Sequence, residues 1–285
     1  MIARGVDDRD REIRQLAGAT FAPVALDNED KLAERFAGCD AVAHCAGINR
    51  EMKSGDFEHV HVEGTRHVER AASKAGVHKI VITSFLRARP NCGSPYHESK
   101  WASEEIIRGS EMDYTVFKSG MVYGRGDHML DHLSHTLFTV PVFACVGLRE
   151  KPIRPIAIAD MVKIMVASLV EGNLSRQTVF VVGPEELRLS EAVSRVASVI
   201  GKHPLIIRLP VAFHQGLALF LEHVMKIPLI SQAQVRMLAE GIVEPAPPCD
   251  ALPNELAPST PFTLSQIKEG LPPPGPFTRS DLMRL

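Results

Sequence analysis

Tyr96 and Lys100 stand four residues apart in the stretch PYHESKW, where the sequence predicts the start of a helix. Residues at this spacing lie on one face of a helix, so the Lys100 ammonium can lie next to the Tyr96 phenol. A phenol has an ordinary pKa of about 10, and a neighbouring ammonium lowers it by favouring the phenolate. Such a pair can move a proton during hydride transfer if a nicotinamide cofactor lies beside it.

Two further segments precede this pair in an order that suits the same chemistry. VITS ends in Thr83 and Ser84 after a strand, and AHCAG brings Ala46 and Gly47 after another strand. Ligands of doubly wound sheets bind at the carboxyl ends of the strands. We expect Ser84, or Thr83 beside it, to hold a reacting hydroxyl or carbonyl, and small residues to let the cofactor approach the backbone. For an isolated Tyr/Lys match the alternative is an exposed tyrosine beside a solvated lysine.

The elements that must position these residues alternate between strands and helices. Strands are expected at 20–26, 40–47, 78–84 and 113–124, and helices at 28–39, 57–76 and 95–110. Strands separated by helices of this length predict a parallel sheet with right-handed crossovers. The expected fold class is therefore α/β, a Rossmann-like doubly wound parallel sheet, with a smaller and mostly helical C-terminal part.

Three regions follow from this pattern. We expect an NAD(P)-binding core at 1–170, a substrate or partner subdomain at 171–270 and a proline-rich tail at 271–285. The apolar segment 209–230 is interrupted by charged and polar residues, which predicts a partly buried amphipathic helix rather than a membrane span. That helix suggests a hydrophobic substrate or a hydrophobic partner surface.

Composition and charge exclude several classes of protein. The chain has 285 residues, 45% of them hydrophobic, and a formal net charge of -2, which gives no reason to expect nucleic acid as a partner. Five cysteines without a CxxC motif favour reduced thiols in the cytoplasm over disulfides or a zinc site. His128 and His132 have a spacing that could ligate a metal, but a polar helix face is the favoured interpretation, and no metal is expected.

Several quoted segments together resemble the short-chain dehydrogenase/reductase superfamily in its extended or atypical branch. They are DAVAHCAGINRE, FEHVHVEGTRHVERAA, HKIVITS, YHESK, FKSGMVYGRGD and RPIAIADMV. The C-terminal sequence resembles the C-terminal part of the subgroup that includes the nucleotide-binding accessory subunit of respiratory complex I. The family usually has Asn where His61 stands, and Arg-Pro where Lys118 and Ser119 stand.

The resemblance implies NAD or NADP as cofactor and assigns its contacts. Asp27 would approach the adenine, Gly47 the cofactor ribose, and Tyr96 and Lys100 the nicotinamide ribose. Arg4 could lie near an adenosine 2′-phosphate, which leans the expectation towards NADP.

One motif of the family pattern is absent from this sequence. The family opens with a strand and a GxxGxxG turn that holds the pyrophosphate, whereas this sequence has only Gly5 and Gly18 near its start. The sheet is therefore expected to be N-terminally truncated, beginning at the family's second strand. Either the chain is a shortened relative, or its true start lies upstream of the sequence as written.

Two functions stay open at this point. The first is an NAD(P)-dependent oxidoreductase or epimerase with Tyr96 as acid/base, Lys100 as its pKa modifier and Ser84 as substrate orienter. The second is a non-catalytic nucleotide-binding or assembly module, like the complex I accessory subunit or associated with a quinone pathway. The expected partner is a small-molecule substrate, with no nucleic acid and no transmembrane segment; peripheral membrane or protein-complex association is left open.

Overall fold

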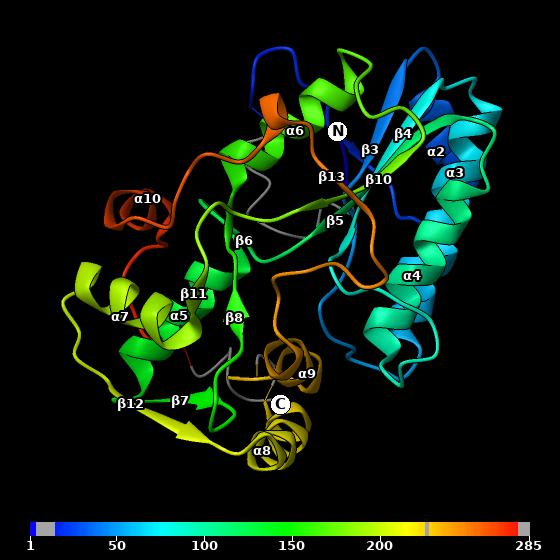
Figure 1. The fold of residues 1–285 in the computed structure, drawn as a ribbon. Helices are drawn as coiled ribbons and strands as arrows, with labels where there is room; N and C mark the ends of the chain where they lie inside the picture. Colours follow the sequence, from blue (N-terminus) through cyan, green and yellow to red (C-terminus); the bar gives the residue numbers. More distant parts are fainter. Residues whose placement is uncertain (4–14, 226–227, 279–285) are drawn as a thin grey trace. The chain divides into compact units, whose positions relative to one another are not determined.

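The computed structural model describes residues 1–3, 15–225 and 228–278. The chain forms two compact units. One unit contains Met1–Phe117 with Met165–Val179, and the other contains Lys118–Ile164 with Phe180–Leu285. Figure 1 shows the ribbon of both.

A sheet of strands forms the centre of the first unit. Strand β3 (Ala41–His44) pairs in parallel with β4 (Lys79–Phe85), so that His44 lies beside Ile82. β5 (Asp113–Ser119) and β10 (Gln177–Val181) follow in the order β10-β5-β4-β3. Side chains on both faces of β4 are buried, as expected of a strand inside a parallel sheet with covered faces.

Three helices pack side by side along this sheet: α2 (Glu29–Phe36), α3 (Gly64–Lys74) and α4 (Pro95–Arg108) (Figure 1). Asn28 begins α2, because its side-chain oxygen accepts a hydrogen bond from the Lys31 backbone N–H at 3.1 Å. Apolar residues of α2, α3, β3 and β4 share one core, which includes the fully buried Ala71, Ala72 and Ile80. The predicted α/β, Rossmann-like class is confirmed.

The first two strands stand apart from that sheet. β1 (Ile2–Ala3) pairs in parallel with β2 (Ala22–Pro23), and the two form a separate two-stranded sheet. Within the described residues neither strand pairs with β3. Ala22 and Val24 are nevertheless buried in the core of the first unit, so side-chain packing rather than a hydrogen-bonded ladder holds this segment.

The second unit is built from short strand pairs and helices. β6 (Val122–Tyr123) pairs with β9 (Ile156–Ala157), β7 (Val142–Val146) with β12 (Leu205–Leu209), and β8 (Pro152–Ile153) with β11 (Leu187–Arg188). Its helices are α5 (His128–Thr139), α7 (Leu189–Val199), α8 (Val211–Val224), α9 (Gln232–Glu240) and α10 (Leu264–Gly270). The short β13 (Asp250–Ala251) and the 3-10 helix η3 (Asn254–Leu256) complete it. Helix α6 (Ile158–Leu169), like β5 and β10, belongs partly to each unit.

Two of the helical segments discussed above are α8 and α5. The segment 209–230 contains α8, which buries His214 and Ala218 while Phe213, Leu219 and Phe220 stay exposed. No helix in the described part of the chain is long and apolar enough to cross a membrane. In α5, His132 Nε2 pairs with the Leu229 carbonyl at 2.7 Å, and the described residues contain no group of three potential metal ligands.

The backbone approach between Gly183 and Pro155 generates a first prediction. A β-carbon at Gly183 would overlap the Pro155 carbonyl, and Gly183 also exchanges hydrogen bonds with Arg154 at 3.2 and 2.9 Å. Gly183→Ala should therefore destabilise the protein by about 3 kcal/mol, because the two segments must separate. Urea unfolding measures this.

Gly216→Ala is the matched control, because a β-carbon there meets no atom within 4 Å and the residue lies inside α8. It should be neutral or stabilise the protein by up to about 1 kcal/mol. Equal stability of the two variants would contradict the packing argument.

Candidate active site

The Lys100 ammonium lies buried at the end of β4. Lys100 is on α4, and its Nζ donates to the Thr83 carbonyl oxygen at 2.7 Å. Burial lowers the pKa of Lys100 to about 8, while the Glu104 carboxylate one turn further along α4 acts in the opposite direction. Lys100 is therefore mostly protonated at neutral pH, but close enough to its pKa to exchange a proton.

Glu104 fixes the hydroxyl of Ser84. Ser84 is buried and its Oγ donates to Glu104 Oε1 at 2.5 Å. The other oxygen of Glu104 accepts from Arg108 Nη2 at 3.1 Å. Glu104 was not among the residues predicted from the sequence, although it lies four residues from Lys100 and eight from Tyr96, on the same face of the helix.

Tyr96 lies in a cage of aromatic rings. Its ring centroid is 5.4 Å from that of Phe57, 5.7 Å from His61, 5.5 Å from Phe85 and 5.9 Å from His97. Burial raises the pKa of Tyr96 to about 12, which is opposite to the predicted lowering by Lys100. The reason is that the rings remove water from the phenol while the Lys100 ammonium is directed at Thr83.

His61 connects the loop after β3 with helix α4. The Ile48 backbone N–H donates to His61 Nε2 at 3.1 Å, so Nε2 carries no proton and Nδ1–H donates to Ser99 Oγ at 2.9 Å. Ser99 in turn donates to the Tyr96 carbonyl at 3.0 Å. Burial lowers the pKa of His61 to about 3, which keeps this imidazole neutral.

The helix expected at 57–76 is not uniform. Residues Glu58–Glu63 form a π-helical turn, η2, before α3 begins at Gly64. The His61 carbonyl accepts a hydrogen bond from Ser103 Oγ at 2.7 Å, so the turn is anchored to α4. Single π-turns inside helices are frequently found at functional sites, and a period count along the sequence does not detect them.

The loop that contains Gly47 lies beside Lys100. Ala46 and Gly47 are both exposed, and a β-carbon at Gly47 would lie 3.5 Å from His61 Nε2 and 3.8 Å from Lys100 Nζ. Gly47 and Lys100 thus lie close together, and Thr83 joins them through its hydrogen bond with Lys100. Tyr96 contacts this group through the ring of His61.

The predicted adenine contact is not part of this group. Asp27 is exposed in the turn between β2 and α2, and among the described residues it has no hydrogen bond or ion pair with the Tyr96 and Lys100 cluster. Arg4, on which the preference for NADP rests, lies outside the described residues.

These residues fit the ribose end of a nicotinamide cofactor. Exposed small residues at 46 and 47 leave the backbone accessible, and the Lys100 ammonium beside them can donate to ribose hydroxyls. The diphosphate end has no counterpart among the described residues, because Gly18 precedes β2 rather than standing between a strand and a helix.

Part of the chain matches a known family, and two characterised proteins are similar to it in sequence. A family model described as NAD(P)H-binding matches residues 3–130. The 40 kDa subunit of NADH-ubiquinone oxidoreductase from Neurospora crassa is 23% identical over 77% of this chain and 58% of its own length. Ceramide reductase from Caulobacter vibrioides is 27% identical over 71% of this chain and 61% of its own. The chain thus spans about three fifths of the length of either relative.

A solved structure shares the fold. UDP-glucuronic acid 4-epimerase from Bacillus cereus, solved in complex with NAD, has a TM-score of 0.65 and 15% identity, covering 92% of this chain and 82% of that one. The parallel sheet with helices along it is therefore the same architecture in both proteins.

These relatives correct the partner prediction. That prediction put a small-molecule substrate first and left association with a protein complex merely open. It is wrong in this respect, because the Neurospora relative is a subunit of a larger enzyme, which points to association with a protein complex.

The ordered Gly47, Ser84, Tyr96 and Lys100 segments, the Rossmann-like sheet and these matches agree with one another. Residues 3–130 match an NAD(P)H-binding family, and the chain shares the Rossmann-like fold of an epimerase solved with NAD.

Proposed function

We propose that this protein is an NAD(P)-dependent oxidoreductase that transfers hydride at a carbinol or carbonyl carbon of its substrate. The observation that carries the proposal is the position of Lys100, whose buried ammonium lies between the Thr83 carbonyl and the Gly47 loop, one helical turn from Tyr96. The match of residues 3–130 to an NAD(P)H-binding family model supports a nicotinamide cofactor, which supplies the hydride when bound.

The side chains divide the remaining work. Tyr96 gives a proton to the forming alkoxide, or takes one from the alcohol, at its phenol oxygen. Aromatic rings surround the Tyr96 ring, and burial partly desolvates its phenol. Lys100 holds the cofactor ribose and replaces the Tyr96 proton, and the Ser84 hydroxyl, fixed by Glu104, orients the reacting oxygen.

Tyr96→Phe should lower turnover by at least about a hundredfold, because the variant lacks the proton-transfer group while keeping the ring that packs against Phe57 and Phe85. Ketones and secondary alcohols, including long-chain oxo-lipids suggested by the ceramide reductase relative, are screened by NAD(P)H absorbance with the wild-type protein first. The variant is then assayed on the best substrate.

Tyr114→Phe is the matched control, since this tyrosine lies on β5 against Arg176 and should leave turnover unchanged. Retention of wild-type turnover by Tyr96→Phe would rule out the assigned role. Titrations with NADH and NADPH, followed by fluorescence, separate loss of chemistry from loss of cofactor binding and show which cofactor is preferred.

The lowered pKa of Lys100 predicts a stability change with pH. Its pKa is about 8 in the folded protein against an ordinary value of 10.5, so between these values the unfolded chain binds more protons than the folded one. The contribution of Lys100 to the free energy of unfolding therefore increases as pH rises through this window, and the folded protein becomes more stable. Between about pH 7 and about pH 9.5 the gain should be about 2 kcal/mol in wild type and absent in Lys100→Met.

Urea titrations at several pH values give this difference between wild type and variant. Lys31→Met, at an exposed lysine on α2, is the control and should not change the pH dependence. A constant difference between wild type and Lys100→Met across the window would show that the Lys100 ammonium is not desolvated.

A second candidate function is a non-catalytic, nucleotide-binding subunit of a larger respiratory assembly. The name of the Neurospora relative favours it. In this case the protein, isolated from its native source and separated by native electrophoresis, should migrate far above its mass of 31.3 kDa together with other subunits. It should also bind NAD(P)H without turning over any substrate of the screen. Migration as a free protein with measurable turnover would exclude this candidate.

A further inference from the structure

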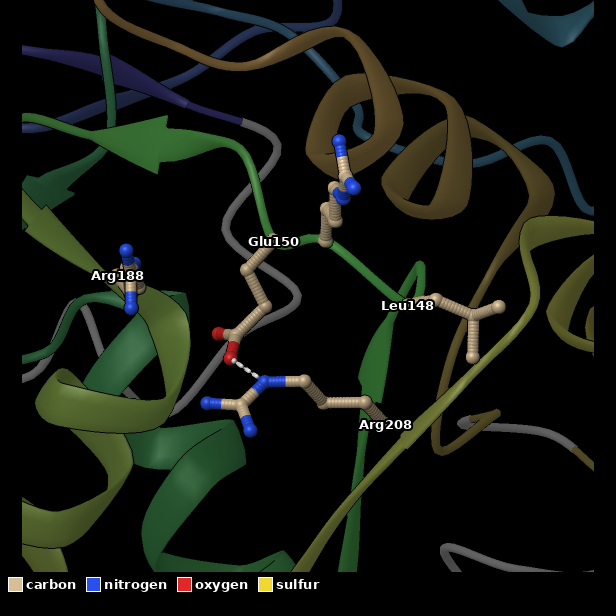
Figure 2. Close-up of a pocket in the computed structure, with 5 residues that line it drawn as sticks. Leu148, Glu150, Arg188 and Arg208 are labelled. Atoms are coloured by element: carbon tan, nitrogen blue, oxygen red, sulfur yellow. Dashed lines mark hydrogen bonds and ion pairs between the residues drawn. The ribbon is translucent and has the colours of Figure 1, made fainter.

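The second unit contains a pocket whose lining is dominated by arginine. A cavity of about 330 Å³ lies between the loop after β7, the start of α7 and strand β12 (Figure 2). Its lining residues are Leu148, Arg149, Glu150, Arg188 and Arg208. Three guanidinium groups and one carboxylate give this lining a formal charge of +2 (three minus one).

The single carboxylate of the pocket is fully engaged. Glu150 Oε1 accepts from Arg208 Nε at 2.7 Å, and Oε2 accepts from the Ser190 backbone N–H at 2.8 Å, at the first turn of α7. The Glu150 side chain is only 3% exposed, whereas that of Arg208 is 47% exposed. Figure 2 shows the Arg208 guanidinium held against Glu150 through its Nε. Glu150 therefore holds Arg208 through its Nε, and within the described residues the two terminal nitrogens of Arg208 have no hydrogen-bond partner.

The other two arginines have no acidic partner. Arg149 and Arg188 are exposed, and within the described residues neither side chain forms an ion pair. Glu191, three residues after Arg188, uses its Oε2 to accept from the Arg188 backbone N–H at 2.7 Å. The pocket thus presents two free guanidinium groups and the open side of a third, a donor set that matches the oxygens of phosphate.

We propose that this pocket binds a phosphate monoester. A phosphate monoester carries close to two negative charges at neutral pH, which balances the lining, and each guanidinium can contact two of its oxygens. The volume lies at the lower end of the range for small-molecule sites, so it has room for part of the group that carries the phosphate. Leu148, 66% exposed, offers that group an apolar contact at the rim. The phosphate can come from a soluble metabolite or from a lipid headgroup.

The test measures direct binding to the full chain. Isothermal titration with inorganic phosphate and with glycerol phosphate addresses the soluble source. Sedimentation with phosphatidylcholine vesicles, with and without phosphatidic acid, addresses the lipid source. Saturable binding that weakens with added salt supports the proposal, and the arm that binds more tightly identifies the source.

Variants place the binding in this pocket. Arg149→Gln and Arg188→Gln should each raise the dissociation constant about tenfold or more, because each removes charge-assisted hydrogen bonds to phosphate. Among the residues that the structure describes, neither side chain has an ion-pair partner, so both variants should unfold at the wild-type temperature. Arg70→Gln makes the same charge change at an exposed position on α3 and should bind as wild type does.

Three results would overturn the proposal. They are no saturable binding of any probe, dissociation constants unchanged in Arg149→Gln and Arg188→Gln, or an equal loss in Arg70→Gln. Unchanged constants would place the phosphate elsewhere, and an equal loss would mean a general charge effect. NAD(P)H titrations of the two pocket variants keep this result separate from the proposed oxidoreductase function, because the pocket residues are not among the residues assigned to the cofactor.

Discussion

A lysine ammonium that is only 7% exposed must be compensated by nearby oxygen atoms, and the candidate active site is organised around this requirement. The Lys100 ammonium donates one hydrogen bond to the Thr83 carbonyl, near the end of strand β4. The negative charge of Glu104 favours the protonated amine from one helical turn away. Glu104 also accepts a hydrogen bond from the Ser84 hydroxyl. Charge compensation of Lys100 and orientation of Ser84 therefore depend on the same carboxylate.

The second constraint on this site is a neutral histidine. His61 accepts a hydrogen bond from Ile48 and donates one to Ser99, and thereby links the loop after β3 to helix α4. The pKa of His61 falls to about 3 because of burial and the neighbouring Lys100 charge, so this link does not change protonation at physiological pH. Where the family usually places an asparagine, this chain has a group that still accepts at one atom and donates at another. His61 lies within the π-turn Glu58–Glu63.

Carboxylates have a comparable role in the second unit, where they hold segments that form little regular structure. Asp160 accepts from the backbone N–H groups of Ser259 and Thr260 at 3.0 and 2.8 Å. Glu185 pairs with Arg195 at 2.6 Å and accepts from the Phe262 N–H at 3.1 Å. A proline-rich stretch with few backbone donors is thus fixed by side chains, because it cannot build its own ladder. Glu150 applies the same principle to an arginine in the pocket of this unit.

The sequence by itself determined the alternation of strands and helices and the order Gly47, Ser84, Tyr96, Lys100, because period and spacing are local properties. It also indicated the family, since those motifs occur in sequence order. The tertiary structure decided which atoms the motif residues meet. Glu104 accepts a hydrogen bond from the Ser84 hydroxyl. Burial among aromatic rings raises the pKa of Tyr96 instead of lowering it. Strands β1 and β2 form a sheet of their own and do not pair with β3 in the described residues. The arginine pocket likewise depends on residues 148–150, 188 and 208, which only folding brings together. Desolvation and charge proximity depend on neighbours distant in sequence, so no local pattern could have specified them.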